Sequence, residues 1–351
     1  MRVLVTGGAG FIGTNLSNRL LSDGHEVILF DNLSRDGVRQ NLDWLRSRHG
    51  GRVHFVKGDV REPCSIEGAM EGVDTVFHLA AQVAVTTSVM SPANDFSINA
   101  LGTLNVLEVA RKLNPMPVVL YTSTNKVYGG LEHISVVERS SRHEFADLPY
   151  GVPETCPLDF HSPYGCSKGA ADQYVRDYHR IYGLPSIVLR MSCIYGPHQF
   201  GNEDQGWVAH FALTGLRGGK LTIYGDGKQV RDLLYVDDLV ELMLRARANV
   251  DKTAGQVFNV GGGPSNTISV WAELSEPLRG MLGNLPQVEY GEFRPGDQKI
   301  YVSDIRKLKN ELNWSPSVDI IEGLRRMFEF WGKEMTNSRK PNAVQSQTRS
   351  F

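Results

Sequence analysis

Short apolar runs and amphipathic stretches alternate along residues 1–190 of the chain. The apolar runs have the length of buried strands, and the stretches between them repeat apolar positions with the period of a helix. Such alternation is typical of an α/β protein, in which helices cover both faces of a Rossmann-type, doubly wound parallel sheet. The predicted strands are residues 2–6, 26–30, 53–57, 75–79, 118–123 and 186–190, and the clearest predicted helices are residues 14–22, 96–112 and 164–182.

Beyond Gly196 and Pro197 the pattern becomes less regular and richer in loops. We therefore divide the chain into a first domain over residues 1–190 and a smaller C-terminal lobe over residues 191–332, part of which returns to the core sheet. Residues 333–351 form a polar tail with scattered charge, which we expect to be disordered. The sequence shows no internal repeat.

A glycine-rich turn follows the first predicted strand. Gly7, Gly10 and Gly13, with Phe11 and Ile12 between them, lead from this strand into an amphipathic helix. Glycines at this spacing permit a tight turn, close approach of the backbone to a pyrophosphate, and close packing of helix on strand. The amides at the start of the helix would face the phosphates. These five residues are therefore predicted to bind a dinucleotide.

Asp31 ends the second predicted strand, where it can bind the adenosine ribose of a dinucleotide. A carboxylate accepts hydrogen bonds from both ribose hydroxyls and repels a 2′-phosphate, so Asp31 favours NAD over NADP. Arg35 is the contrary signal, because a guanidinium can bind a 2′-phosphate. Asp59 ends the third strand and would suit the adenine amino group, but an ordinary turn aspartate fits the same place. Further candidate cofactor contacts are Asn32, Ser34, Val60, Leu79, Ala80, Ala81, Gln82 and Asn99.

Tyr164 and Lys168 lie one turn apart on the same face of a predicted helix. A nearby ammonium lowers the pKa of a phenol, so this tyrosine can act as a base or an acid. Thr124 follows the fifth predicted strand, at the edge where such sheets bind ligands. Taken alone, the Tyr–Lys pair fits a solvated helix and Thr124 fits a helix cap. Their joint presence with the glycine-rich turn favours catalysis.

Composition limits the classes of partner. Lys plus Arg number 37 against 39 Asp plus Glu, so no positive excess indicates a nucleic acid. No apolar run approaches the length of a membrane span, and the chain starts without a cationic segment or cleavage site. The cysteines lack metal-type spacing, so we expect no metal and reduced thiols in a cytoplasmic protein. They are Cys64, Cys156, Cys166 and Cys193.

The ordered set of glycine-rich turn, Thr124, Tyr164 with Lys168, and the sequence from Gln229 to Asp232 resembles the extended short-chain dehydrogenase/reductase superfamily. The resemblance covers about residues 1–332 and points to the nucleotide-sugar epimerases and dehydratases. It implies a tightly bound NAD that transiently oxidises a secondary alcohol of a bound sugar. Tyr164 would then move the hydroxyl proton. Lys168 would lower the pKa of Tyr164 and hold the nicotinamide ribose, and Thr124 would hydrogen-bond the reacting oxygen.

The same resemblance makes residues 191–332 a substrate-binding lobe. It assigns the diphosphate of a nucleotide sugar to Arg231 and Arg294, which can each donate bidentately, whereas surface salt bridges are the alternative. Where 4-epimerases of the superfamily often have a substrate-contacting asparagine, this chain has Cys193, so the substrate pose is expected to differ. A homodimer or higher homo-oligomer is implied, built through the helices over residues 96–112 and 164–182.

Residues 123–129 and 158–174 resemble the branch of the superfamily that inverts carbon 2 of CDP-hexoses. We therefore expect epimerisation at carbon 2 through a 2-keto sugar, with a UDP-sugar 4-epimerase or a catalytically silent NAD-binding module as alternatives. Asn125 and Lys126 stand where 4,6-dehydratases have an acidic pair, which disfavours dehydration. His161 is interpreted as a packing or capping residue. Trp207 fits base stacking and core burial equally well.

Overall fold

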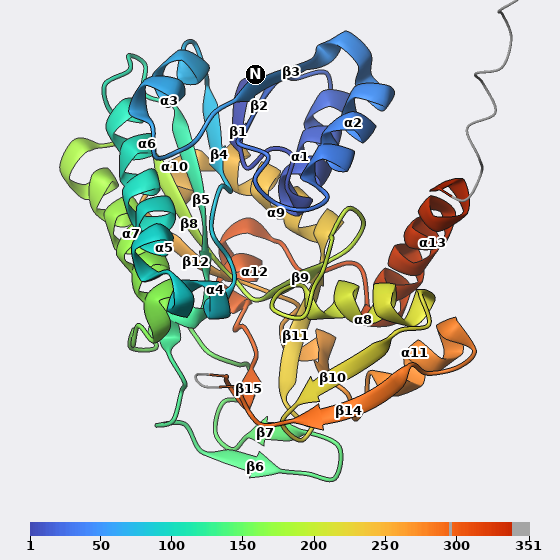
Figure 1. Ribbon diagram of the computed structural model, residues 1–351. Coiled ribbons are helices and arrows are strands. Elements are labelled where there is room, and N and C mark those ends of the chain that lie inside the picture. Colours follow the sequence, from blue (N-terminus) through green and yellow to red (C-terminus); the bar gives the residue numbers. More distant parts are fainter. Residues whose placement is uncertain (295–296, 339–351) are drawn as a thin grey trace, which may run out of the picture.

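The structure is a computed structural model that describes residues 1–294 and 297–338. Its central sheet has seven parallel strands in the order β12-β8-β5-β4-β1-β2-β3 (Figure 1). The order confirms the predicted doubly wound α/β sheet, because it reverses direction at β1. The strands are β1 (Arg2–Thr6), β2 (Glu26–Asp31), β3 (Val53–Lys57), β4 (Thr75–His78), β5 (Val118–Thr124), β8 (Ser186–Met191) and β12 (Val257–Val260).

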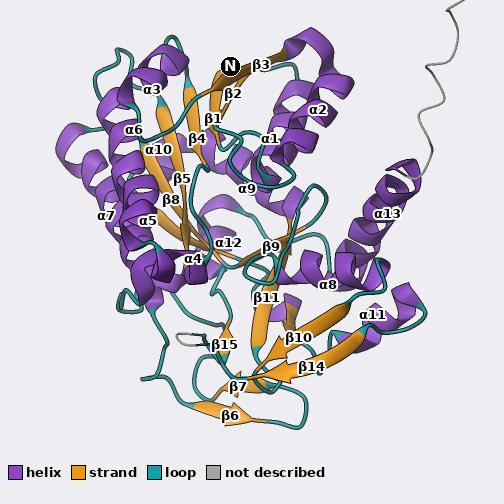
Figure 2. Cartoon of the chain, viewed as in Figure 1, coloured by secondary structure: helices purple, strands orange, loops and turns teal. Residues whose placement is uncertain are grey.

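Helices cover both faces of this sheet, as Figure 2 shows. Each face has its own hydrophobic core, built from the apolar side of its helices and alternate residues of the strands. One face carries α1 (Phe11–Ser22), α2 (Val38–His49), α9 (Val236–Ala248) and α12 (Arg306–Leu312). The other carries α3 (Pro63–Met70), α6 (Gly102–Ala110) and α7 (Ser162–Tyr182).

The carboxyl ends of the central strands meet at one edge of the sheet. Thr6 at the end of β1 pairs with Phe30 of β2 on one side and with His78 of β4 on the other. Thr124 ends β5 beside Met191 of β8. Because the order of strands reverses between β1 and β4, a crevice for a ligand is expected above these residues.

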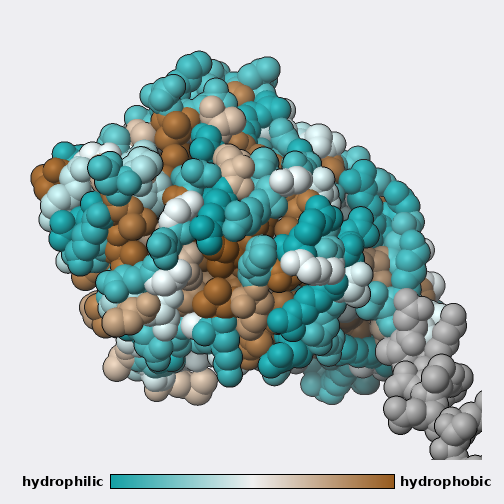
Figure 3. All heavy atoms as spheres, turned by 90° about the horizontal axis from the view of Figure 1, so that it is seen from above, coloured by the Kyte–Doolittle hydropathy of each residue, from teal (hydrophilic) through white to brown (hydrophobic). Residues whose placement is uncertain are grey.

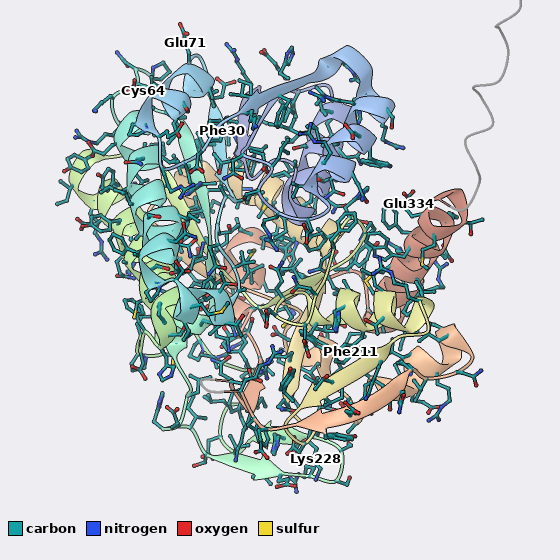
Figure 4. The ribbon with its side chains drawn as sticks, viewed as in Figure 1. Phe30, Cys64, Glu71, Phe211, Lys228 and Glu334 are labelled. Atoms are coloured by element: carbon teal, nitrogen blue, oxygen red, sulfur yellow. The ribbon has the colours of Figure 1, made fainter. Side chains whose placement is uncertain are left out.

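The smaller lobe has a hydrophobic core of its own. Phe211 lies in this core, whereas Phe30 belongs to a core of the central sheet (Figure 4). The lobe sheets consist of β9 (Cys193–Tyr195), β10 (Lys220–Tyr224), β11 (Val230–Tyr235), β13 (Thr267–Ser269), β14 (Gln287–Gly291) and β15 (Ile300–Tyr301). Its main helices are α8 (Trp207–Leu216), α11 (Ser275–Leu282) and α13 (Ile320–Ser338).

The connection between β5 and α7 contains a hairpin of β6 (Val136–Glu138) and β7 (His143–Phe145). Several polar contacts attach this hairpin to the lobe. His143 Nε2 lies 3.1 Å from Asp226 Oδ2, and Lys228 Nζ donates to Glu138 Oε1 at 2.7 Å. Figure 4 labels Lys228 beside the hairpin.

Two sequence predictions meet a different local structure. The helix expected over residues 96–112 consists of α5 (Pro92–Phe96), a π-helical turn η2 (Ser97–Leu101) and α6. It begins earlier than predicted because Pro92 suits the first turn of a helix. Residues 333–338 of the expected polar tail form the end of α13, and residues 339–351 lie outside the described part.

The remaining short segments connect these elements. They are η1 (Gly50–Arg52), α4 (Val85–Met90), η3 (Asn125–Tyr128), α10 (Val250–Thr253) and η4 (Pro264–Asn266). No helix within residues 1–294 and 297–338 is both long and apolar enough to cross a membrane. Over these same residues, no group of three or more His, Cys, Asp or Glu is placed to hold a metal ion.

Candidate active site

A cavity of about 770 Å³ lies above the carboxyl ends of the central strands and extends to the lobe segment over residues 191–208. It lies at the predicted crevice. The sequence-predicted residues that line it are Gly7, Gly10, Phe11, Ile12, Gly13, Asp31, Asn32, Ser34, Arg35, Asp59, Val60, Leu79, Ala80, Ala81, Gln82, Thr124, Tyr164 and Lys168. Asn99, Arg231 and Arg294 are not among the residues that line it.

The glycine-rich turn is packed so closely that side chains would not fit. A Cβ on Gly13 would lie 2.2 Å from the Gly7 carbonyl oxygen, and one on Gly7 would lie 2.9 Å from the Ala80 nitrogen. Gly7 also has a φ of 68°, in the left-handed region. Gly10 caps α1 without a side-chain hydrogen bond, so the first amides of this helix remain available for an anion. This cradle fits the pyrophosphate of a dinucleotide.

Asp31 ends β2 and lines the cavity. Its side chain is buried, and its two oxygens accept hydrogen bonds from Leu33 N at 2.8 Å and Ala9 N at 3.1 Å. Burial raises the pKa of Asp31, and these two amides and the charge of Arg35 oppose that effect. The positive charge of Arg35 therefore acts on Asp31, and both side chains line the cavity.

Asp59 is held by neighbours on both sides. Arg61 Nη2 donates to its Oδ2 at 2.7 Å, and Asn32 Nδ2 donates to the same oxygen at 2.9 Å. The hydrogen bond with Arg61 is the largest reason that the pKa of Asp59 is far below its usual range. Asp59 is thus ionised and faces the cavity, although its turn contacts also fit the ordinary structural interpretation.

Tyr164 lies against Thr124 at the floor of the cavity, with 8% of Tyr164 and 7% of Thr124 exposed. Burial raises the pKa of Tyr164 to about 12, and the hydrogen bond with Thr124 lowers it. Thr124 also caps η3, because its Oγ1 accepts a hydrogen bond from Lys126 N at 3.3 Å. The capping role and a place beside the phenol therefore coexist in one residue.

Lys168 is buried one turn further along α7, with 3% of its surface exposed. Its Nζ donates to the Thr122 carbonyl at 2.5 Å and lies 4.3 Å from the centre of the Tyr121 ring. Burial lowers the pKa of Lys168 to about 7, while Asp172 and Asp95 raise it. The sequence predicts that Lys168 lowers the pKa of the phenol, but the causes that shift the pKa of Tyr164 are burial, Thr124, Asp95 and Arg35.

The two arginines predicted to bind a diphosphate, Arg231 and Arg294, form ion pairs with carboxylates. Arg231 is buried on β11 and donates to Asp297 Oδ1 at 2.8 Å and to the Gln298 carbonyl at 2.7 Å. Arg294 donates to the Glu203 carbonyl at 3.0 Å. Its Nη2 lies 3.7 Å from Asp204, which lines the cavity. Both guanidiniums thus stand at the lobe side, and each faces an acid.

Lys126 and Asn125 turn toward the same lobe segment. Lys126 Nζ lies 3.6 Å from Asp297 Oδ1, and Asn125 Nδ2 donates to Gln298 Oε1 at 3.0 Å. Neither residue offers a carboxylate to the cavity. His161 lies at the exposed start of α7 and makes no side-chain capping bond.

Cys193 and Trp207 form part of the lobe wall of the cavity. The Trp207 Nε1–H donates to Cys193 Sγ at 3.4 Å, and burial raises the pKa of that thiol. Sequence reasoning missed other residues of this wall, because most of them lie in the irregular segment around Gly201 and Gly206, where no periodic signal exists, while Met191 ends β8 and Ser192 follows it. They are Met191, Ser192, Gln199, Phe200, Asn202, Asp204 and Gln205.

The family follows from comparison with known proteins. A model of the NAD dependent epimerase/dehydratase family matches residues 3–261, so the chain belongs to this family. The superfamily resemblance read from the sequence is confirmed, and the chain is an enzyme with NAD as its cofactor.

Similarity to individual proteins is more specific than the match to the family. The chain is 45% identical over 343 residues to a CDP-paratose 2-epimerase of Salmonella typhi, covering 94% of this chain and 99% of that protein. It is 33% identical to a UDP-glucose 4-epimerase of Mycolicibacterium smegmatis, covering 94% and 98%. The crystal structure of a Thermotoga maritima UDP-glucose 4-epimerase with UDP-glucose matches with a TM-score of 0.81 at 34% identity, covering 95% of this chain and 100% of that one.

Proposed function

We propose that this enzyme inverts carbon 2 of a nucleotide-diphosphate hexose, as in the conversion of CDP-paratose to CDP-tyvelose. The observation that carries the proposal is the 45% identity to a CDP-paratose 2-epimerase along nearly the whole of both chains. UDP-glucose 4-epimerases are 33% identical over a similar length. The site agrees, because Thr124 and Tyr164 lie side by side in a cavity large enough for cofactor and sugar together.

The cofactor would be held by the glycine cradle at the pyrophosphate, by Asp31 at the adenosine ribose, and by Lys168 at the nicotinamide end. Bound NAD supplies the oxidant for a sugar carbinol and, in its oxidised form, a positive charge that favours an ionised phenol. Asp31 is the reason for proposing NAD in preference to NADP, since its buried carboxylate would face a 2′-phosphate.

Tyr164 takes the proton of the carbinol as a ketone forms and returns it on reduction. Thr124 donates a hydrogen bond to the phenol or to the reacting oxygen, which stabilises negative charge at either atom. Lys168 contributes a buried positive charge beneath them. Because these side chains are shielded from water, their interactions are stronger than they would be at the surface.

The nucleotide diphosphate would bind at the lobe side through Arg231 and Arg294. Each guanidinium now contacts an acid, Asp297 or Asp204, so a diphosphate would compete with these carboxylates. Arg231 is buried and Arg294 less so, which makes Arg231 the stronger anchor. A CDP-hexose is the proposed substrate, on the strength of the Salmonella relative alone.

The test is a substrate panel. Purified protein without added NAD is expected to convert CDP-paratose to CDP-tyvelose, with the product identified by NMR from the proton coupling at carbon 2. UDP-glucose and UDP-galactose test the 4-epimerase alternative in the same assay. Failure on every CDP- and GDP-hexose tested would remove the proposed function, and turnover of the UDP-sugars alone would replace it.

A homodimer is proposed from the exposed apolar side chains on the α4, α5 and α7 side. α4 and α5 pack against α7. Val89 is 61%, Met90 78%, Phe96 57% and Ile181 65% exposed. Figure 3 shows hydrophobic patches on the left of the face seen from above, the side on which Figure 1 places α7. A second copy, related by a two-fold axis, would cover this surface. Ile181→Asp should yield a monomer in analytical ultracentrifugation if the proposal holds.

The cytoplasm is the proposed location. All four cysteines are free thiols, and a reducing compartment keeps them so. The thiols of Cys64 and Cys166 are exposed, so an oxidising compartment would put them at risk. Fractionation of the producing cell with an antibody against the chain tests this directly.

A further inference from the structure

Asp95 is a buried carboxylate next to the catalytic helix, and the reaction described above gives it no role. It lies on α5 with 1% of its surface exposed. A carboxylate is almost never buried to this extent unless other groups compensate it. Its surroundings therefore indicate what it does.

Both oxygens of Asp95 accept hydrogen bonds from residues around the active site. Ser167 Oγ of α7 donates to Oδ2 at 2.5 Å. Gln82 Nε2 donates to Oδ1 at 2.8 Å, and Asn99 Nδ2 of η2 donates to the same oxygen at 3.1 Å. Ser167 lies directly before Lys168, and Gln82 lines the cofactor cavity. Asp95 thus joins the helix that carries the Tyr–Lys pair to the segment that follows β4.

Asn99 reinforces the same junction. Its Oδ1 accepts from Gln82 N at 2.9 Å, and its Nδ2 donates to the Gln82 carbonyl at 3.0 Å. Ser167 Oγ lies 3.2 Å from Asn99 Nδ2. The amide and the carboxylate together fix the backbone and side chain of Gln82, so a change at Asp95 would be felt at both walls of the cavity.

The charge of Asp95 acts on Lys168. The groups that face this ammonium are Asp95 from α5, Asp172 from α7, the Tyr121 ring and the Thr122 carbonyl from β5, and His78 from β4. Burial lowers the pKa of Lys168, and only the two aspartates raise it. Asp172 is committed to a bidentate ion pair with Arg190, with both distances 2.9 Å. Within the described part of the chain, no Lys or Arg forms an ion pair with Asp95, and its donors are neutral.

We propose that Asp95 is a positioning residue for the Tyr164–Lys168 pair: its buried carboxylate anchors α7 to the segment at Gln82 through Ser167 and Asn99. The proposal rests on the proposed epimerase function, because turnover is its main readout. It adds a residue that does not touch the sugar and that acts through Gln82 and through its charge on Lys168 and Tyr164.

The test compares Asp95→Asn, which removes the charge at constant size, with Ser167→Ala, which keeps the charge and removes one donor. Asp95→Asn should lower kcat at pH 8 at least tenfold with little change in KM, and should move the alkaline limb of the kcat–pH profile down by about one pH unit. The shift is downward because Lys168, having lost a negative neighbour, gives up its proton more readily. Bound NAD, measured by mass after denaturation, should remain present.

Ser167→Ala should move the acidic limb of the kcat–pH profile. Losing a donor raises the pKa of Asp95, so Asp95 becomes neutral at a higher pH and the acidic limb moves upward. Asp177→Asn removes an exposed charge from α7, and Ser97→Ala removes a hydroxyl from η2 that bonds only the Asn94 carbonyl. Both controls should leave the profile in place.

A purely structural role predicts lower kcat with both limbs unmoved, and that result would overturn the proposal, as would an Asp95→Asn enzyme with normal kcat. If Asp95→Asn is insoluble, Ser167→Ala still tests the proposal, because an acidic limb that stays in place would show that the contact between Ser167 and Asp95 does not act on turnover. Inactivity of the unmodified enzyme on the whole substrate panel would instead count against the proposed function.

Discussion

The side chains around Tyr164 and those around Arg231 are held by different kinds of structure. Tyr164 and Lys168 lie on the long helix α7, and Thr124 ends a central strand. Arg231 starts from β11, but its partner Asp297 belongs to an irregular segment, and Arg294 lies beyond the end of β14. The first group is fixed by sheet and helix, and the second depends on loops.

We propose that this difference separates chemistry from recognition. Loops supported by a rigid scaffold change more readily than the scaffold itself. The chain shares its fold with 4-epimerases and dehydratases, as the structural matches show. We therefore expect mutations at Tyr164 or Thr124 to lower kcat, and mutations at Arg231 or Arg294 to raise KM. The predictions below are ordered by expected size.

Tyr164→Phe should have the largest effect. It removes the titrating hydroxyl but keeps the buried ring, so turnover should fall by about 100- to 10,000-fold while NAD stays bound. Initial rates and the NAD released on denaturation check the two parts. Near-normal turnover would mean that another residue is the base and would contradict the assignment of the chemistry to the side chains around Tyr164.

Thr124→Val should act on the pH profile. The hydrogen bond with Thr124 lowers the pKa of Tyr164, so its loss raises that pKa and moves the acidic limb of turnover to higher pH. A hydrogen bond to a charged group corresponds to about one to two pH units and about a 10- to 100-fold loss of turnover below the limb. Thr124→Ser, which keeps the hydroxyl, is the matched control. An identical profile for both variants would contradict the assigned role.

Asp31→Ala should weaken the binding of NAD and should not change kcat at saturating NAD. Removing the carboxylate costs the ribose its charged hydrogen bonds, so NAD affinity should fall by roughly tenfold or more. With NAD restored to saturation, kcat should recover. Isothermal titration with NAD and NADP measures the effect, and a wild-type protein that binds NADP more tightly would show that Arg35 determines the preference.

Arg231→Lys and Arg294→Lys should give the smallest changes, confined to KM. Lysine keeps the charge but loses bidentate donation. Arg231→Lys changes a buried side chain and should raise KM by about tenfold. Arg294→Lys changes a more exposed side chain and should raise KM only about twofold. Steady-state kinetics with the active CDP-hexose compares them. A large fall in kcat for either variant would mean that recognition and chemistry are not separated as argued.

Much of this site could be predicted because its signals are local. The glycine-rich turn, Asp31 at a strand end and the Tyr164–Lys168 spacing each depend on a few adjacent residues, and all line the cavity. Asp95 could not be found in this way. Its partners Ser167 and Gln82 are distant in sequence, and a lone aspartate before an apolar helix carries no signal.

The predicted diphosphate site was also only partly predictable from the sequence. Arg231 meets Asp297 only after the lobe has folded, so sequence could propose a free arginine but not its acidic partner. The π-helical turn at η2 was likewise invisible, because a change to i→i+5 hydrogen bonds over only five residues is too short to alter the apolar period of the helix visibly. Long-range contacts and irregular turns thus account for most of what the sequence left out.

The most direct test of the central claim follows the hydrogen at carbon 2. Paratose has no 3-hydroxyl, so no adjacent ketone can make this hydrogen acidic, and inversion requires direct oxidation at carbon 2. CDP-paratose deuterated at carbon 2 should therefore keep its label in CDP-tyvelose when the reaction runs in ordinary water. Unlabelled substrate in heavy water should gain no deuterium there. Solvent deuterium at carbon 2 of the product would contradict the account.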